Sequence, residues 1–246
     1  MAKRIKGDDY WIPLADLMTG LMLIFLFISA AAIRNSHETA SDYVHKKQDI
    51  YKSLKMEFSE KELHDWGAEI IESPTLSVRF KNPEVLFASG KSDLQPKFEI
   101  ILAQFFPRYL KVVSNKDYES MVSHMQIEGY TSSVWSGAGD INDAFFNNMN
   151  LSQQRTISTL KYLYYLDQST ESNLQQELGW STESYHKYLR NEVTANGLSS
   201  SHLIYKDNCD IEKNSNCVED KQRSQRVEFT IIFNSDQIAN SLAGAN

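Results

Sequence analysis

The sequence lacks the excess of positive charge that is typical of a nucleic-acid-binding protein. Its 25 lysines and arginines are outnumbered by 32 aspartates and glutamates, and the formal net charge is −7. Nucleic-acid binders normally present a basic surface, so we expect no direct contact with nucleic acid. Catalytic signatures are missing too: there is no G-x-S-x-G, no P-loop and no H-x-x-x-H spacing among the six histidines. We therefore predict no enzymatic activity, no metal site and no cofactor.

Long hydrophobic runs are also missing, with one exception at residues 11–33. This run, WIPLADLMTGLMLIFLFISAAAI, contains a single carboxylate, Asp16, and no lysine or arginine. As a helix it is about 34 Å long, which is enough to cross a bilayer core once. It is too long for a cleaved signal peptide, and its small residues match a cleavage site only weakly. We therefore expect a retained, single-pass transmembrane helix.

The charges that flank this run predict its orientation. Lys3, Arg4 and Lys6 precede it, whereas only Arg34 follows it closely. Positive charge favours the cytoplasmic side of a membrane. Residues 1–10 are therefore expected in the cytoplasm, and the rest of the chain is expected on the opposite side.

Cysteine is scarce, and both copies, Cys209 and Cys217, lie in the part expected to be exported. In an oxidising compartment a disulfide across such a short loop is the favoured interpretation. The alternative is two free thiols. A bridge here would hold a local loop and would have no catalytic part.

Residues 34–75 are polar and charged, but apolar side chains recur among them at helical spacing. No proline or glycine interrupts the segment before Gly67. The pattern predicts an amphipathic helix leaving the membrane. It is either packed on the domain that follows or serves as a linker that plugs a channel in the membrane; amphipathicity alone does not decide. The apolar positions are Tyr43, Ile50, Leu54, Phe58 and Leu63.

Residues 76–233 alternate between strand and helix patterns, which predicts an α+β domain with helices on one face of a mixed sheet. Two stretches do not follow the strand and helix patterns of a compact domain. Residues 132–147 are predicted to be a surface loop, and residues 168–196 are predicted to be an inserted helical element. The tail, 234–246, is small and polar and is expected to fray. The expected strands are 76–80, 85–87, 125–129 and 226–233, and the expected helices are 97–113 and 151–166.

Four motifs in this region resemble, in order, those of OmpA-like peptidoglycan-binding domains. They are LFASGKSDLQP from Leu86, IEGYTS from Ile127, NMNLSQQR from Asn148 and QRVEFTI from Gln225. The family's usual signatures are a phenylalanine strand followed by glycine, a G-(H/Y)-T-D turn, N-x-x-L-S-x-x-R-A and a closing R-V-E strand. The cysteine pair before the last strand also resembles an OmpA feature. The resemblance implies a βαβαβ-type, periplasmic, peptidoglycan-binding domain.

The apolar run resembles the membrane helix of MotB-type stator subunits, through the segment ADLMTGLMLIFLF. Together the helix and the OmpA-like domain resemble a MotB-type subunit of the bacterial inner membrane, with the Zorya antiphage defence branch the nearest. The resemblance implies a homodimer within a ring of a multi-helix membrane subunit of MotA or ZorA type. Its further partners would be peptidoglycan and membrane lipids, and the transported ion would be H⁺.

The resemblance also implies which residues bind the cell wall. In the family, the aspartate of the turn and the later arginine grip the ionised ends of the diaminopimelate stem peptide. Here the aspartate position is Ser132, beside Thr131, while Arg155 is retained and can hold a carboxylate bidentately. Asn148 and Leu151 match the motif and would shape the pocket. Wall binding is expected to be weaker or to use other contacts, for example Asp140 from the neighbouring loop.

In the transmembrane helix, the resemblance points to Asp16 as the proton carrier. Thr19 and Gly20 lie on the same face, where small residues let another helix approach closely. Asp16 would take up a proton on one side and release it on the other, with Thr19 bonding to the acid or to a relay water. Alternatively, Asp16 sits near the membrane end and simply reaches cytoplasmic water.

Three functions are therefore weighed. The first is a proton-driven stator subunit, in antiphage defence or in flagellar motility. The second is a passive tether between membrane and cell wall, in which Asp16 is incidental. The third, an enzyme acting on peptidoglycan, is disfavoured because no catalytic constellation is present.

Overall fold

The computed structural model describes residues 11–168 and 174–234, which fall into two compact units. The described part of the first unit is the helical stretch up to His45, and the second unit is 46–234. Helix α1, Trp11–Glu57, contributes residues to both. The expectations for residues 1–10 and for the tail beyond Asn234 lie outside the described residues.

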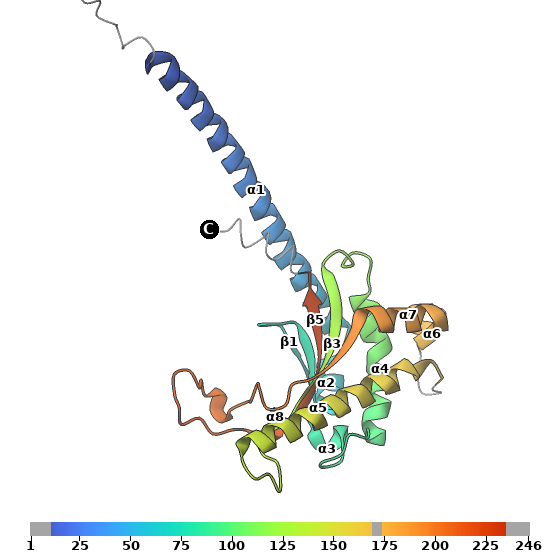
Figure 1. Ribbon diagram of the computed structural model, residues 1–246. Coiled ribbons are helices and arrows are strands. Elements are labelled where there is room, and N and C mark those ends of the chain that lie inside the picture. The colour runs from blue at the N-terminus through green and yellow to red at the C-terminus, as the bar shows by residue number, and fades with distance from the viewer. Residues whose placement is uncertain (1–10, 169–173, 235–246) are drawn as a thin grey trace, which may run out of the picture. The chain divides into compact units, whose positions relative to one another are not determined.

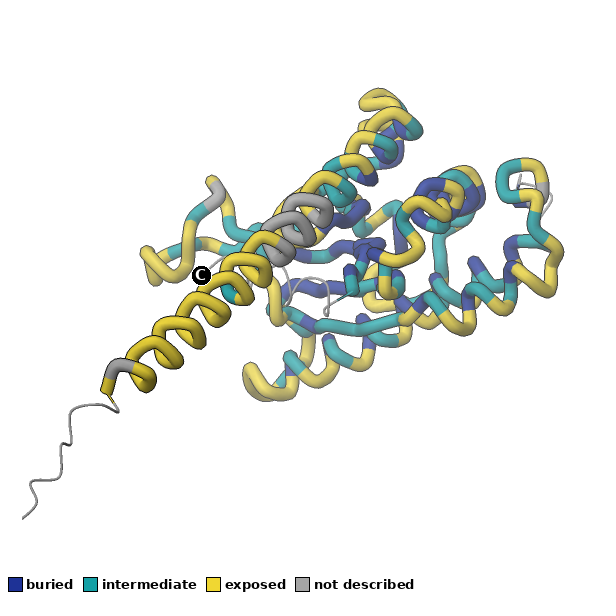
Figure 2. The backbone as a smooth tube through the Cα atoms, turned by 90° about the horizontal axis from the view of Figure 1, so that it is seen from above, coloured by how far each residue is buried: buried dark blue, intermediate teal, exposed yellow. Residues whose placement is uncertain are grey.

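In the first unit, the apolar side chains of α1 are exposed within the chain itself (Figure 2). Pro13–Arg34 is the one described helix long and apolar enough to cross a membrane. Leu17, for example, is 62% exposed and Phe25 is 71% exposed. Such exposure costs free energy in water, at about 25 cal/mol per Å² of apolar surface. The segment therefore needs an apolar environment that the chain does not supply.

The second unit is built on a five-stranded mixed sheet with the order β1-β2-β5-β3-β4 (Figure 1). All neighbouring strands are antiparallel except β3 and β4, which are parallel. The prediction of an α+β domain with a mixed sheet behind an apolar helix is confirmed. The strands are β1 (Ala68–Ile71), β2 (Ser77–Phe80), β3 (Val122–Tyr130), β4 (Val193–Gly197) and β5 (Arg226–Phe233).

One face of the sheet is apolar and carries the principal helices. Phe229 of β5 lies 5.1 Å, ring centroid to ring centroid, from Phe105 of α4, and Phe80 of β2 lies at the same distance from Phe105. Phe58 and Trp66 extend this aromatic cluster. The helices of this unit are α2 (Glu60–Trp66), α3 (Pro83–Leu86), α4 (Pro96–Val113), α5 (Ile141–Tyr164), α6 (Leu174–Leu178), α7 (Thr182–Glu192) and α8 (Lys221–Ser224).

The opposite face of the sheet is polar and closed by an ion-pair network. Glu228 accepts hydrogen bonds from Arg226 Nε at 2.6 Å, Arg79 Nε at 3.0 Å and Ser77 Oγ at 3.0 Å. Burial opposes the ionisation of Glu228, but the two guanidiniums outweigh it and lower the pKa of this carboxyl. Arg226 also lies over the Tyr130 ring, 3.7 Å from its centroid. Each buried charge on this face is therefore paired.

Several local expectations differ from the structure. Residues 85–87, expected to be a strand, mostly belong to α3, because Pro83 occupies the first turn of this helix, where its missing N–H costs nothing. Only Phe87 is extended, and it forms an isolated bridge with Leu94. The predicted loop at 132–147 ends early, since α5 begins at Ile141. The predicted insertion at 168–196 contains α6 and α7 but runs into β4, a regular strand of the sheet.

The segment expected as a linker, 34–75, also contributes to the second unit. From Lys46 onward it belongs to the compact domain, and β1 pairs with β2. Ile50, Leu54 and Phe58 are fully buried, which is the packed-helix alternative of the two considered. The end of α1 is further tied to α4, because Arg108 Nε donates to Glu57 Oε1 at 2.7 Å. The boundary of the domain thus precedes the expected residue 76.

Candidate functional site

A cavity of about 390 Å³ lies where α5 meets two loops and the short helix α8. All five residues predicted to bind peptidoglycan line it, although they come from separate parts of the sequence. The loop after β3 contributes the first two and α5 the other three. These residues are Thr131, Ser132, Asn148, Leu151 and Arg155.

Two glycines set the position of α5 over the sheet. A Cβ on Gly129 of β3 would lie 2.8 Å from Ser152 O, and a Cβ on Gly197 of β4 would lie 2.3 Å from Gln153 N. The helix backbone can approach this closely only because both side chains are absent. Gln153 then fastens the contact: its Oε1 accepts from Gly197 N at 2.7 Å, and its Nε2 donates to Ala195 O at 3.1 Å. Helix α5, which carries Asn148, Leu151 and Arg155, is thereby fixed to the edge of the sheet.

Arg155 is the most unusual group in the cavity, because it is a buried cation without an acidic partner. It is 5% exposed, and no carboxylate of the described residues forms an ion pair with it. Its Nε donates to Lys91 O at 2.9 Å, and its guanidinium lies 4.8 Å from the centroid of the Phe87 ring. Burial lowers the pKa of Arg155 to about 10, so the group is still charged at neutral pH. An unpaired buried charge is costly, and an anionic ligand would relieve that cost.

The loop at residues 131–134 supplies a second unsatisfied group. Thr131 is 3% exposed, and its Oγ1 has no hydrogen-bond partner among the described residues, while its backbone N–H donates to Ser199 O at 2.8 Å. A buried hydroxyl without a partner costs free energy, which a bound ligand would recover. Asn148 holds the loop, because its Nδ2 donates to Ser132 O at 3.1 Å and to Val134 O at 3.3 Å. Asn148 therefore acts on the shape of the cavity.

Sequence reasoning missed Lys221 and Gln225, which also line the cavity. They belong to α8 and the residue after it, directly before the closing R-V-E strand, and no periodic pattern marks such a short helix. Gln225 Nε2 donates to Lys221 O at 3.1 Å. Lys221 adds a second cation to the site. The signal available was that Gln225 opens the recognised motif QRVEFTI and that Lys221 lies four residues before it.

The stretch before α8 is closed by the predicted disulfide, which joins Cys209 and Cys217. Glu219 follows it and binds the cavity loop: its carboxylate accepts from Ser133 N at 3.1 Å and from Ser133 Oγ at 2.5 Å. Asp140, considered as a substitute for the missing aspartate, does not line the cavity. It caps α5 instead, accepting from Asn142 N at 2.8 Å and Asp143 N at 2.9 Å.

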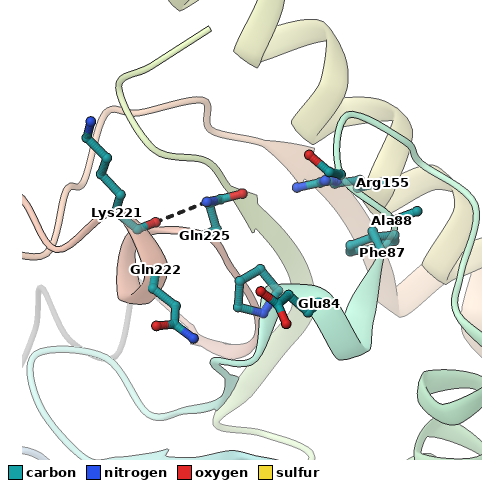
Figure 3. A pocket seen from close by; sticks show the side chains of 9 residues that line it. Glu84, Phe87, Ala88, Arg155, Lys221, Gln222 and Gln225 are labelled. Carbon is teal, nitrogen blue, oxygen red and sulfur yellow. Dashed lines mark hydrogen bonds between the residues drawn. The ribbon is translucent and has the colours of Figure 1, made fainter. Parts of the chain in front are cut away.

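A second hollow of about 470 Å³ adjoins the first and shares Ser89, Arg155, Lys221 and Gln225 with it (Figure 3). Apart from Gln222 of α8, its remaining lining comes from the region of α3 and includes one carboxylate, Glu84. Arg155 therefore lines both hollows. Only the hollow on the α3 side has an acid in its lining.

Asp16 and Thr19, the predicted proton relay, lie one turn apart on α1. Both are exposed within the chain. Thr19 Oγ1 donates to Ala15 O at 2.8 Å, one turn back on the same helix, and thus not to Asp16. Among the residues that the structure describes, none forms a polar path around this acid. Among residues 11–168 and 174–234, no group of three or more histidine, cysteine, aspartate or glutamate side chains is placed to hold a metal ion.

The sequence aligns over most of its length with a Zorya protein. The chain is 37% identical over 243 residues to the Zorya protein ZorB of Escherichia coli strain ATCC 8739, and the alignment covers 96% of this chain and 93% of that protein. The chain belongs to the ZorB family. No protein-family model matches it.

Solved structures similar to this ZorB-family chain include a MotB-like protein from Desulfovibrio vulgaris, with 20% identity, 79% of this chain and 99% of that chain covered, and a TM-score of 0.47. The periplasmic domain of Helicobacter pylori MotB gives 14% identity, 72% and 87% coverage, and a TM-score of 0.41. At these scores the likenesses carry no functional argument. Membership of the ZorB family confirms the resemblance read from the motifs, and it agrees with a non-enzymatic protein.

Proposed function

We propose that this chain is the peptidoglycan-anchored subunit of a proton-driven stator complex in the bacterial inner membrane. In this proposal α1 spans the membrane once, with the N-terminus in the cytoplasm and the sheet domain in the periplasm. Two copies of the chain sit within a ring of a multi-helix subunit of MotA or ZorA type. The name of the E. coli relative, a Zorya protein, favours antiphage defence over flagellar motility as the setting.

The observation that carries the wall-binding part is the buried, unpaired Arg155 within the cavity formed by the predicted motif residues. A guanidinium offers two parallel N–H groups that match the two oxygens of a carboxylate, which is the chemistry of a stem-peptide end. Thr131 offers a hydroxyl without a partner beside it. These groups support a ligand-binding site rather than a structural ion pair.

The ion-conducting part rests on Asp16. A carboxylate within a transmembrane segment is costly and usually marks an ion path. Each proton that crosses a potential of 100 mV supplies about 2.3 kcal/mol. Helices of other subunits would have to line the path, because Asp16 is exposed on α1 within the described part of the chain. A passive tether remains the alternative function, since the wall-binding site alone would suffice for it.

Sedimentation with purified sacculi tests the wall-binding part. Substituting Asn148, Leu151 and Arg155 together by Ala is expected to abolish co-sedimentation of the full-length protein. Gln154→Ala is the matched control, because Gln154 lies on the same helix but is exposed, and its side chain bonds only to Asn150. Unchanged co-sedimentation of the triple variant, with its folding verified by circular dichroism, would remove the wall-binding assignment.

A further inference from the structure

We propose, building on the wall-binding function, that the 390 Å³ cavity selects a ligand end carrying carboxylates and needs no free amine, with Lys221 as a second anion-binding residue. Such a ligand is a stem peptide whose amino group is already acylated, as it is in a cross-link. The inference concerns which chemical form of the peptide is recognised. It depends on the charges that line the cavity and on their partners.

The charged residues that line the cavity within the described chain are all positive. Its described lining includes two cations, Arg155 and Lys221, and no aspartate or glutamate. The nearest acid on the loop side, Glu219, is occupied by two hydrogen bonds from Ser133. The other polar lining residues are neutral: Ser89, Thr131, Ser132, Ser136, Asn148 and Gln225. An ammonium group entering this space would meet like charges and no counter-charge.

Arg155 has most of its hydrogen-bonding capacity left for a ligand. Of its five N–H donors, only the one on Nε has a partner within the described chain, Lys91 O. The two terminal nitrogens can therefore donate to both oxygens of one carboxylate. Thr131 also lines the cavity, and its buried Oγ1 has no hydrogen-bond partner within the described chain. One carboxylate is thus accommodated without any contribution from Lys221.

Lys221 is available for a second negative charge. It is exposed, and it has no ion pair within the part of the chain that the structure describes. Its backbone is held firmly: Asp220, the N-cap of α8, accepts from Arg223 N at 3.1 Å, and Asp220 N donates to Ile204 O at 2.8 Å. The anchor of the lysine is fixed while its amine is free to follow a ligand.

Glu84 offers an alternative, in which the ligand keeps a free ammonium group and binds it through this carboxylate. It lies in the adjoining hollow, on the α3 side of the space that Arg155 faces, so a zwitterionic ligand would place its ammonium there (Figure 3). We favour the carboxylate-only arrangement because Glu84 is exposed, whereas the unpartnered Thr131 hydroxyl and the predicted motif residues all line the acid-free cavity. The two arrangements make opposite predictions for how acylation of the ligand's amine changes its affinity.

Calorimetric titration of the full-length protein with three peptides separates them. The probes are a stem tripeptide ending in diaminopimelate, the same peptide acetylated on its side-chain amine, and the same peptide with the diaminopimelate carboxylates amidated. The acetylated form is expected to bind at least as tightly as the free form. The amidated form is expected to bind at least about tenfold more weakly, because two charge-assisted contacts are lost.

Two substitutions sharpen the result. Lys221→Gln is expected to weaken binding of the acetylated peptide about threefold to tenfold, and Lys221→Glu is expected to shift the preference toward the free amine. Lys187→Gln is the charge-matched control, since Lys187 is an exposed lysine on α7 outside the cavity. It is expected to change neither affinity nor selectivity.

Tighter binding of the free amine by tenfold or more would overturn the inference, and loss of that preference in Glu84→Gln would assign the ammonium to the α3 side. Binding of sacculi without measurable binding of any of the three peptides would also overturn it, because the ligand would then not be the stem peptide. Neither result would affect the proposed function. Failure of the unaltered protein to bind sacculi would instead remove the proposed function itself.

Discussion

The cavity at Arg155 and the helix face at Asp16 are two candidate sites of opposite construction. Arg155 of α5 is 5% exposed; its Nε donates to Lys91 O, and its guanidinium lies over the Phe87 ring. Asp16 is exposed, and so are the large apolar side chains around it in residues 13–34 of α1. The cavity is assembled from one chain, whereas any ion path at Asp16 has to be completed by other subunits. The variants below test whether the two sites are separable in this way.

The largest effect is expected from Asp16→Asn. The amide has nearly the shape of the acid but cannot carry a proton through a protonation cycle, so phage protection should be lost completely. Co-sedimentation with sacculi should stay at the level of the unaltered protein, because Arg155 and its surroundings are unchanged. Plaque counts on cells carrying the complete defence locus are the measurement. Full protection by this variant would instead favour the passive tether.

Glu228→Gln is expected to destabilise the sheet domain without any direct contact with either site. It leaves the buried Arg226 without its charge partner, which typically costs about 3–5 kcal/mol. Chemical unfolding followed by tryptophan fluorescence measures the change. Glu183→Gln, at an exposed position on α7, is a control that should leave the midpoint unchanged. An unaltered midpoint in Glu228→Gln would mean that the network on the polar face adds little.

The stability of the domain should also fall with acid. Arg108 lowers the pKa of Glu62 from 4.5 to about 2, chiefly through its hydrogen bond to the carboxylate. A group whose pKa is depressed on folding contributes stability above its unfolded pKa, and this contribution is lost as the pH falls through the folded value. Unfolding midpoints should therefore decrease from about pH 4.5 toward pH 2. Arg108→Met should flatten this part of the pH profile.

Gly197→Ala is expected to damage the cavity selectively. The added Cβ would lie 2.3 Å from Gln153 N, so α5 has to move away from β4. Forcing an extra methyl into a packed contact typically costs about 1–3 kcal/mol. Gly139→Ala is the matched control, since the only atom near its Cβ belongs to the end of a flexible side chain, Asp143. We expect weaker sacculus binding from Gly197→Ala alone, and equal binding by both variants would show that the helix position is unimportant.

The smallest effect on sacculus binding is expected from replacing Cys209 and Cys217 together by Ser. Closing such a short loop stabilises a folded protein by about 2–3 kcal/mol in the chain-entropy account. The loop lies at the surface, while Glu219 is bonded to Ser133 independently of the bridge. A slightly lower unfolding midpoint with retained sacculus binding is therefore the expected outcome. Complete loss of binding would mean that the bridge itself maintains the cavity.

The sequence predicted the elements whose patterns repeat. Strand β5 alternates Val, Phe, Ile and Phe on its apolar face, and it was placed at the residues where it is observed. Strand β4, VTANG, has no such alternation because it lies at the edge of the sheet, and it was absorbed into an expected insertion. Strand β1 is only four residues long and was hidden within an expected linker. The strand expected at 85–87 was wrong because apolar content outweighed the signal of Pro83.

The cavity was predictable only where a motif marks it. Residues from all four motifs converge on one space. Lys221 and Gln225 were missed because their contribution depends on how the segment between the disulfide and β5 folds back on the 131–134 loop. The role of Asp140 was equally hidden, because a carboxylate that caps a helix and one that faces a ligand look alike in sequence. The roles of these residues follow from their positions in three dimensions, and the local sequence pattern does not encode those positions.

The two hydrogen bonds of the Gln153 side chain bear on how the domain transmits force. The side-chain amide bonds to both Ala195 and Gly197 in the manner of a neighbouring strand, so α5 is joined to the sheet edge as if it supplied an extra rung. A pull on a ligand held at Arg155 would reach the sheet through α5 and would load both of these hydrogen bonds. In the proposed stator role, this joint would carry the force between the cell wall and the sheet.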